Sequence, residues 1–364
     1  MCMKILLVSL YGRGGMVHYA SQIANALSFD NEVTVIAPTH IEQKYFNKNV
    51  NLKLIKAPHS LVKSIFQSFN FFELRSLINY IKDYKPDVIH FVNEHPWNNI
   101  IIFKFKGEHK MVLTCHDPNP HPGERNSLIL KLFKLSTLCQ LKKVDRIIVH
   151  GNNMVDELKK QNISSKKIDV IPHGDYQFFT NYSPSSSSTD NSILFFGRIK
   201  LYKGIEYLIQ AELLISQVLT DYKIVIAGEG DLSRYSKYLE HNKKFEIINR
   251  YIEDSEVSYF FTKCKVVVLP YIEASQSGII PIAYAFKKPV VATNVGSLPE
   301  VVEDGLTGYL VQPKNPNALA EAIIKLFKDD NLSERIGENG YLKMKNELAW
   351  NKIADKTIEV YTKS

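Results

Sequence analysis

The sequence predicts an α/β protein built from two doubly wound, Rossmann-like domains. Short, fully apolar runs alternate with amphipathic helical stretches along the whole chain. Apolar strands separated by helices are typical of buried parallel sheets. A polar, serine-rich stretch interrupts this alternation near the middle of the 364 residues, a length that suits two domains of ordinary size.

The first domain is expected over residues 1–175, followed by a linker over residues 176–191. Its amphipathic helices include Val17–Leu27 and Leu128–Lys143. Its strand candidates are the apolar runs Lys4–Ser9, Glu32–Ala37, Leu52–Lys56, Asp87–Val92, Met111–Cys115, Arg146–His150 and Asp169–Ile171.

The second domain is expected over residues 192–345. Its strand candidates are Ser192–Phe196, Lys223–Ala227, Phe245–Asn249, Val266–Pro270 and Pro289–Ala292, and its helix candidates are Gly204–Ser216, Ser255–Cys264, Gly278–Phe286 and Ala318–Phe327. Ligands of open parallel sheets bind beyond the carboxyl ends of the strands. With two such domains facing each other, we expect the site in a central cleft.

The composition indicates a cytoplasmic protein. Its charge also leaves open a peripheral contact with the inner face of a membrane. No apolar run approaches the roughly 18 residues of a membrane span, and the first apolar run is too short for a secretory signal. Cys2, Cys115, Cys139 and Cys264 lack the paired spacing of a disulfide framework or a zinc site. A reducing cytoplasm is therefore expected.

The net positive charge of the chain comes entirely from its first half. Residues 1–175 contain 23 Lys and Arg against 15 Asp and Glu, whereas the remainder contains 22 against 23. An anionic partner such as a membrane surface or a lipid phosphate explains this excess, and a solvated basic face explains it equally well. No nucleic acid is expected as a partner.

Two glycine-containing turns are candidates for phosphate binding. Gly14 and Gly15 follow the first strand and precede a helix, whose N-terminus favours an anion. In the second domain, Gly197 and Arg198 end a strand, and Lys203 follows at a helix start. A glycine and two cations around one strand end suit a diphosphate, because arginine offers a planar fork and lysine a mobile charge. Each turn alone is also compatible with an ordinary surface loop.

Several motifs of the second half recur together, and they are Phe196–Arg198, Lys203-Gly204, Pro289–Thr293, Gly296–Glu300, Gly305–Gly308 and Trp350–Ala354. Jointly they resemble the donor domain of glycosyltransferase family 4, and the likeness is greatest over residues 192–312. The resemblance implies the GT-B fold and a retaining enzyme that needs no metal and no cofactor. It also implies that the last helix, about 346–364, returns to the first domain.

The same resemblance implies roles for the residues that match. Arg198 and Lys203 would hold the donor diphosphate, beside Gly197, and the Gly14-Gly15 loop would cover the phosphates. His116 would lie beside the donor sugar. The donor would be a UDP- or GDP-sugar.

One departure from the family concerns two glutamates that many relatives carry eight positions apart. Those positions are Ala274 and Ile282 here. Glu273, next to the first, is a candidate substitute. The residues Ser275, Gln276, Ser277 and Gly278 resemble a variant of the family, and they precede an apolar helix. We expect them to provide the second contact to the donor phosphates.

The acceptor is expected to bind the polar, proline-rich loop that follows the strand at Met111–Cys115. The candidate contacts are Asp117, His121 and Glu124. A structural rim loop is the alternative. The stretches Leu61–Leu77 and Leu128–Lys143 are amphipathic, so they either rest on a membrane that carries a lipid-linked acceptor or pack on the sheet.

Together these observations predict a hexosyltransferase-like enzyme that moves a sugar, with retention, to a saccharide or a lipid-linked saccharide in polysaccharide or glycoconjugate synthesis. Two alternatives stay open. A nucleotide-sugar 2-epimerase has the same architecture, and a non-catalytic binding protein would explain the missing glutamates. The presence of Arg198, Lys203 and His116 argues against the second alternative.

Overall fold

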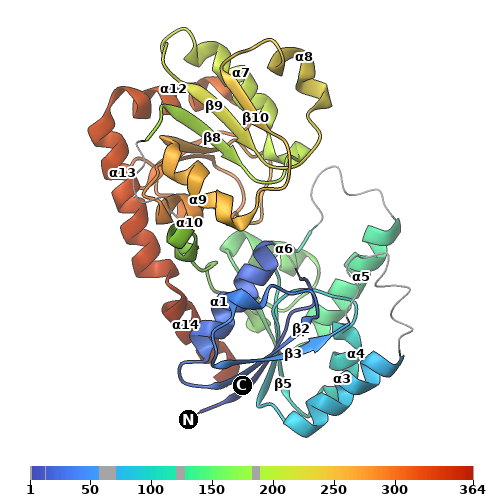
Figure 1. Ribbon diagram of the computed structural model, residues 1–364. Helices are drawn as coiled ribbons and strands as arrows, with labels where there is room; N and C mark the ends of the chain where they lie inside the picture. Colours follow the sequence, from blue (N-terminus) through green and yellow to red (C-terminus); the bar gives the residue numbers. More distant parts are fainter. Residues whose placement is uncertain (1, 13, 57–70, 120–127, 183–188, 364) are drawn as a thin grey trace. The chain divides into compact units, whose positions relative to one another are not determined.

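A computed structural model describes residues 2–12, 14–56, 71–119, 128–182 and 189–363, with only the backbone at 71 and 128–130. The chain divides into two compact units, which are described separately. The first contains the described residues up to Gly174 and those from Trp350 onward, and the second contains Asp175–Ala349 (Figure 1).

The first unit is built on a parallel sheet. In the described part of this unit the sheet has seven strands, in the order β3-β2-β1-β4-β5-β6-β7. Their bounds are β1 Lys4–Val8, β2 Glu32–Pro38, β3 Val50–Ile55, β4 Val88–Phe91, β5 Lys110–Thr114, β6 Arg146–Val149 and β7 Ile168–Val170.

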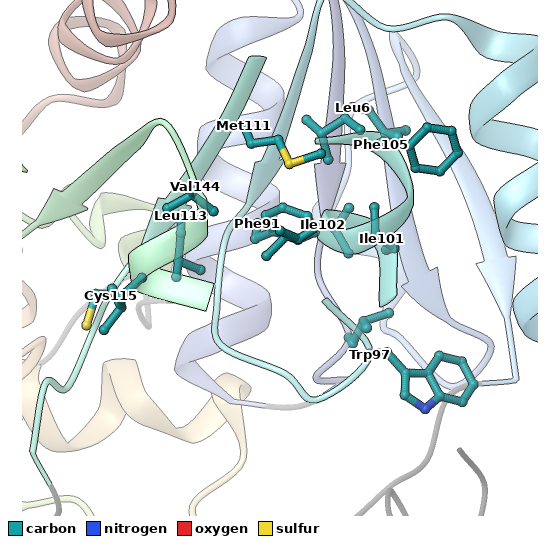
Figure 2. Packing of buried hydrophobic residues seen from close by; sticks show 14 of the residues in the cluster. Leu6, Phe91, Trp97, Ile101, Ile102, Phe105, Met111, Leu113, Cys115 and Val144 are labelled. Carbon is teal, nitrogen blue, oxygen red and sulfur yellow. The ribbon is translucent and has the colours of Figure 1, made fainter. Parts of the chain in front are cut away.

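Helices contribute to the core of this unit from one face of the sheet. Buried side chains of α3, α4, α5 and α6 join one cluster with strand residues such as Leu6, Phe91 and Leu113. Figure 2 shows Ile101, Ile102 and Phe105 of α4 in this cluster. Helix α1 instead packs against the last helix, α14. The helices are α1 Gly15–Leu27, α3 Phe71–Tyr84, α4 Asn98–Phe105, α5 Leu128–Lys143, α6 Asn152–Lys160 and α14 Trp350–Thr362, with short 3-10 turns η1 Gln43–Tyr45 and η2 Ser165–Lys167.

The second unit repeats the plan with a six-stranded parallel sheet among its described residues. Its strand order is β10-β9-β8-β11-β12-β13. The bounds are β8 Ser192–Phe196, β9 Lys223–Ala227, β10 Phe245–Ile248, β11 Val266–Leu269, β12 Val290–Thr293 and β13 Gly308–Val311. The short, glycine-led β13 is absent from the sequence-based expectation.

Helices and turns complete the second unit. The helices are α7 Ile205–Ile215, α8 Ser236–Leu239, α9 Asp254–Lys263, α10 Ile279–Ala285, α11 Leu298–Val301, α12 Pro316–Lys328 and α13 Asp330–Lys343, and the turns are η3 Gln177–Tyr182, η4 Leu201–Lys203, η5 Ser233–Tyr235 and the π-helical η6 Met344–Leu348. Tyr176 and Phe179 lie within the stretch expected to be a linker. Their rings stack 5.8 Å apart and are buried in the core of this unit.

The predicted fold class is confirmed: both units are parallel, doubly wound α/β sheets. The predicted strands agree with the observed ones to within about two residues, because fully apolar runs between helices are specific to buried parallel strands. Part of the expected helix over Leu61–Leu77 lies outside the described residues. In the described chain, none of the helices combines the length and apolar character that a membrane crossing requires.

Candidate active site

Each sheet reverses its strand order once, and the candidate residues follow the strands at these two places. In the first unit the reversal lies between β1 and β4, and in the second between β8 and β11. Open α/β sheets bind ligands beyond the carboxyl ends of the strands at such points. Gly14 follows β1, Glu94 follows β4, Gly197 follows β8 and Tyr271 follows β11. The fold therefore provides one candidate binding edge in each unit.

In the second unit, two predicted residues, Lys203 and Ser277, are brought together around Tyr271. The Lys203 ammonium donates to the Tyr271 hydroxyl at 2.7 Å and lies 4.4 Å from the centre of its ring. The Tyr271 oxygen is 3.4 Å from the Ser277 hydroxyl, which also accepts from the Ile279 amide at 3.3 Å. Sequence reasoning did not single out Tyr271, because an aromatic residue after a strand is more often part of a core.

These contacts orient Lys203 and hold the Ser277 hydroxyl at the same strand end. Either hydroxyl can be the donor between Tyr271 and Ser277, because the Tyr271 oxygen can accept from Lys203 and from Ser277 together. Where Tyr271 is the donor, the Ser277 oxygen accepts from it and from the Ile279 amide, and the Ser277 proton is then available for an anion. A cation, a hydroxyl donor and a helix start thus meet at the carboxyl end of β11, a combination suited to phosphate oxygens.

Arg198 follows Gly197 directly, but the pocket that it lines is not one that Lys203, Tyr271 or Ser277 also line. It is exposed and lines a pocket of about 450 Å³, together with Lys200, Glu229 and Arg234. Gly197 has a φ of 100°, and a Cβ there would be 3.9 Å from the Lys203 ammonium. Glycine therefore lets the chain turn here, and it leaves the space beside the Lys203 ammonium free of a side chain.

The segment that replaces the family's glutamates follows Tyr271. Glu273 is exposed, and the Gln276 side-chain oxygen is buried without a hydrogen-bond partner. Ile282 is buried in the core of the unit, so its position does not present a ligand group. A Cβ on Gly278 would be 3.1 Å from the Tyr176 hydroxyl. Gly278 therefore makes room for Tyr176 as well as for any ligand.

In the first unit, the Gly14-Gly15 turn opens α1. Gly14 has a φ of 65°, and a Cβ there would meet no atom within 4 Å. Its carbonyl accepts from the Val17 amide at 2.9 Å. The turn thus requires a left-handed conformation, which glycine adopts without strain, and it has open space above it.

The His116 ring is buried rather than presented at the surface. Its Nε2 atom is 2.9 Å from the Val92 carbonyl oxygen, and its Nδ1 atom is 3.1 Å from Nε2 of His150. Tyr19 packs edge-on against both rings. In this arrangement the backbone of His116, and not its ring, is the part that can meet a ligand.

The buried histidines of this unit are held neutral. Burial lowers the pKa of His116, lowers that of His173 to about 4 and holds that of His150 well below its usual range. His150 Nδ1 also lies 3.0 Å from the Ile171 carbonyl. A neutral histidine ring has one N–H group, so His116 and His150 have two between them. Their rings make three contacts: one to the Val92 carbonyl, one to the Ile171 carbonyl and one to each other. One of these contacts therefore has no proton between its atoms. Among the described residues no group of His, Cys, Asp and Glu side chains is arranged to hold a metal ion.

Glu94 is a candidate that the sequence did not reveal. Its carboxylate accepts from the His116 amide at 3.1 Å. Burial raises its pKa to about 7, the Asp117 carboxylate adds to that shift, and hydrogen bonds to the carboxylate oppose it. Asp117 itself is exposed. The other predicted acceptor contacts, His121 and Glu124, lie outside the described residues.

Comparison with known proteins agrees with this architecture. Residues 13–174 match the family described as Glycosyltransferase Family 4, and residues 180–343 match Glycosyl transferases group 1. An uncharacterized glycosyltransferase of Methanocaldococcus jannaschii is 27% identical over 99% of this chain and 98% of its own length. The O-antigen chain mannosyltransferase C of Escherichia coli is 23% identical over 80% and 79%. The structure of Anabaena HepE with UDP-glucose matches with a TM-score of 0.75 and 17% identity, over 98% of both chains.

Two Rossmann-like units of this kind, each with its candidate edge at a sheet reversal, are the architecture of the GT-B fold. The two family matches together span most of the chain. The chain belongs to glycosyltransferase family 4.

Proposed function

We propose that this protein transfers a sugar from a UDP- or GDP-sugar to a saccharide or lipid-linked saccharide, with retention of the anomeric configuration. The observation that carries the proposal is the Lys203–Tyr271–Ser277 chain of contacts beside Gly197, with Arg198 the next residue along the chain. It offers two cations and a hydroxyl donor at the sheet reversal of the second unit. The UDP-glucose bound to the similar HepE structure supports a nucleotide-sugar as the donor.

The chemistry proposed for this edge is stabilisation of a departing diphosphate. As the bond between the sugar and the phosphate breaks, negative charge builds on the phosphate oxygens, and pre-oriented donors stabilise it. Lys203 is oriented by Tyr271, and Arg198 offers a planar fork. In this proposal the two cations take the role that a metal ion has in other transferases. The acceptor oxygen forms the new bond to the anomeric carbon, and the departing phosphate oxygen accepts the proton of the acceptor hydroxyl.

We propose a role in polysaccharide or glycoconjugate synthesis in the cytoplasm. The similarity to an O-antigen mannosyltransferase supports the pathway class. The four cysteines carry free thiols, which suits a reducing compartment.

Donor binding is the first prediction. A ligand at about 100 times its Kd stabilises the folded protein by about 2.7 kcal/mol, so one nucleotide-sugar of a UDP, GDP and ADP panel is expected to raise the melting temperature in EDTA. Lys203→Ala is the matched variant, in which the shift should shrink. A panel without any shift would contradict the proposal. Conversion of the bound donor to free UDP and an epimer, without transfer, would identify a 2-epimerase.

On the acceptor side, we propose that Glu94 binds an acceptor hydroxyl next to the one that reacts. It is partly exposed at the sheet reversal of the first unit, and the His116 amide fixes one of its oxygens. An ionised carboxylate accepts a hydroxyl proton more strongly than a neutral carboxyl. Because the pKa of Glu94 is raised to about 7, the binding form increases as the pH rises through that value.

Glu94→Gln tests this role. Acceptor kcat/KM is expected to fall by about ten- to a hundredfold, the usual worth of a hydrogen bond to a charged group. The rise of activity with pH through about 7 should disappear, while donor affinity stays unchanged. Steady-state kinetics with the acceptor varied at saturating donor measure both effects. Glu108→Gln, at an exposed site before β5, is the matched control. An unchanged pH profile in Glu94→Gln would remove Glu94 from the acceptor site.

A further inference from the structure

Helices α4 and α5 carry large apolar side chains that point to solvent. Phe103 on α4 is 81% exposed, and Leu132 and Leu135 on α5 are 50% and 62% exposed. The opposite sides of both helices are buried in the core of the first unit. Exposed apolar side chains that gather on one surface mark an interaction site more often than isolated ones do.

The two helices adjoin one another, and Phe103 lies about two turns along α5 from Leu135. Asn99 of α4 donates to the Ser136 hydroxyl of α5 at 2.8 Å. One turn further along α4, the Phe103 ring lies 5.8 Å from the Lys143 ammonium of α5. Figure 1 shows the two helices on the same side of the unit. Phe103 therefore lies at the Lys143 end of α5.

Helical spacing places the α5 residues on one stripe. Leu132, Leu135 and Lys142 follow one another at intervals of three and seven residues, which puts them on one side of a helix. Lys131 and Lys143 flank this stripe. Phe103, Leu132, Leu135, Lys131, Lys142 and Lys143 are called the α4–α5 surface below.

The charge of this surface has one sign. Neither α4 nor α5 contains an Asp or a Glu, and α5 alone carries Lys131, Lys134, Lys142 and Lys143. The same unit holds the whole positive excess of the chain. Apolar side chains surrounded by lysines suit the boundary between headgroups and acyl chains of an anionic bilayer.

We propose that the α4–α5 surface binds the first unit to a membrane that contains anionic phospholipids. Phe103, Leu132 and Leu135 enter the interface, and the lysines contact lipid phosphates. This inference rests on the proposed function, because a lipid-linked saccharide acceptor is what such a membrane would present to the enzyme.

Vesicle sedimentation with the full chain tests the surface. The wild-type protein is expected to bind vesicles of equal parts phosphatidylcholine and phosphatidylglycerol, but not phosphatidylcholine alone, and salt should weaken binding. Phe103→Ser with Leu135→Ser should weaken it about tenfold or more. Lys131→Gln with Lys142→Gln should weaken it about fivefold for each lysine.

Phe29→Ser is the matched control. Phe29 is 77% exposed, but it follows α1, outside the core cluster of α4 and α5, and it precedes Asp30. This variant should bind vesicles as the wild type does. No vesicle binding by the wild type, or full binding by Phe103→Ser/Leu135→Ser, would overturn the proposal and favour a protein partner. Because donor and acceptor are omitted, this result is independent of whether the transfer function is correct.

Discussion

Replacement of Arg198 or Lys203 by alanine is expected to lower turnover by about 10²–10³, the usual loss for one pre-oriented stabiliser of developing charge. Lys203→Ala also leaves the Tyr271 hydroxyl without its donor. Because both cations act more strongly on the departing diphosphate than on the bound donor, kcat should fall more than the affinity for the nucleotide-sugar. Steady-state kinetics with the nucleotide-sugar varied measure kcat and KM separately.

Lys223→Ala is the control for both variants. Lys223 begins β9, at the amino end of a strand in the same sheet, and its side chain is 64% exposed. It carries the same charge but lies at the opposite edge of the sheet, so its removal should leave turnover unchanged. Near-wild-type rates in both Arg198→Ala and Lys203→Ala would contradict the proposal that these residues bind the diphosphate.

Gly296→Ala is expected to have the second largest effect. Gly296 has a φ of 56°, and a Cβ there would overlap the carbonyl oxygen of Ala274. The neighbouring Ser297 amide donates to the Ser275 carbonyl at 3.2 Å. An alanine must therefore displace the segment that leads into Ser277. The free energy of unfolding should fall by about 2–5 kcal/mol, from overpacking and a left-handed backbone together, and turnover by about 10²-fold.

Gly305→Ala separates the cost of the left-handed backbone from the cost of the overlap with Ala274. Gly305 has a φ of 73°, but a Cβ there would meet nothing within 4 Å. It should therefore show only the backbone cost of about 1–2 kcal/mol and keep donor binding. Denaturant unfolding measures the free energy of unfolding, and calorimetric titration with UDP measures donor binding. Equal losses in the two variants would mean that the contact between Gly296 and Ala274 does not position the donor segment.

Apart from β13, the described strands were predictable because each is an apolar run between helices, whereas parts of the site depend on contacts distant in sequence. Glu94 meets the His116 amide from 22 residues away, and a lone carboxylate after a strand has no diagnostic spacing. Lys203 meets Tyr271 across 68 residues. Arg198, Lys203 and Ser277 could be selected in advance, since cations and small residues at strand ends and helix starts follow local rules.

The burial of His116 was not predictable in the same way. A histidine after a strand is compatible with a ligand contact, and only the packing of Tyr19 and His150 shows that its ring faces inward. The segment around Tyr176 and Phe179 looked like a linker because serine-rich sequence follows it. Their aromatic rings instead pack in a core. Burial of apolar surface is favourable even where the residues that follow in the sequence are polar.

Proton NMR of the product of a single transfer tests the central claim most directly. The purified chain would be incubated in EDTA with the nucleotide-sugar that gives the largest thermal shift and with its acceptor. An α-linked donor should give an α-linked product together with free nucleoside diphosphate. A β-linked product from that donor, or transfer that begins only when a divalent metal is added, would contradict a retaining reaction in which Arg198 and Lys203 stabilise the leaving diphosphate.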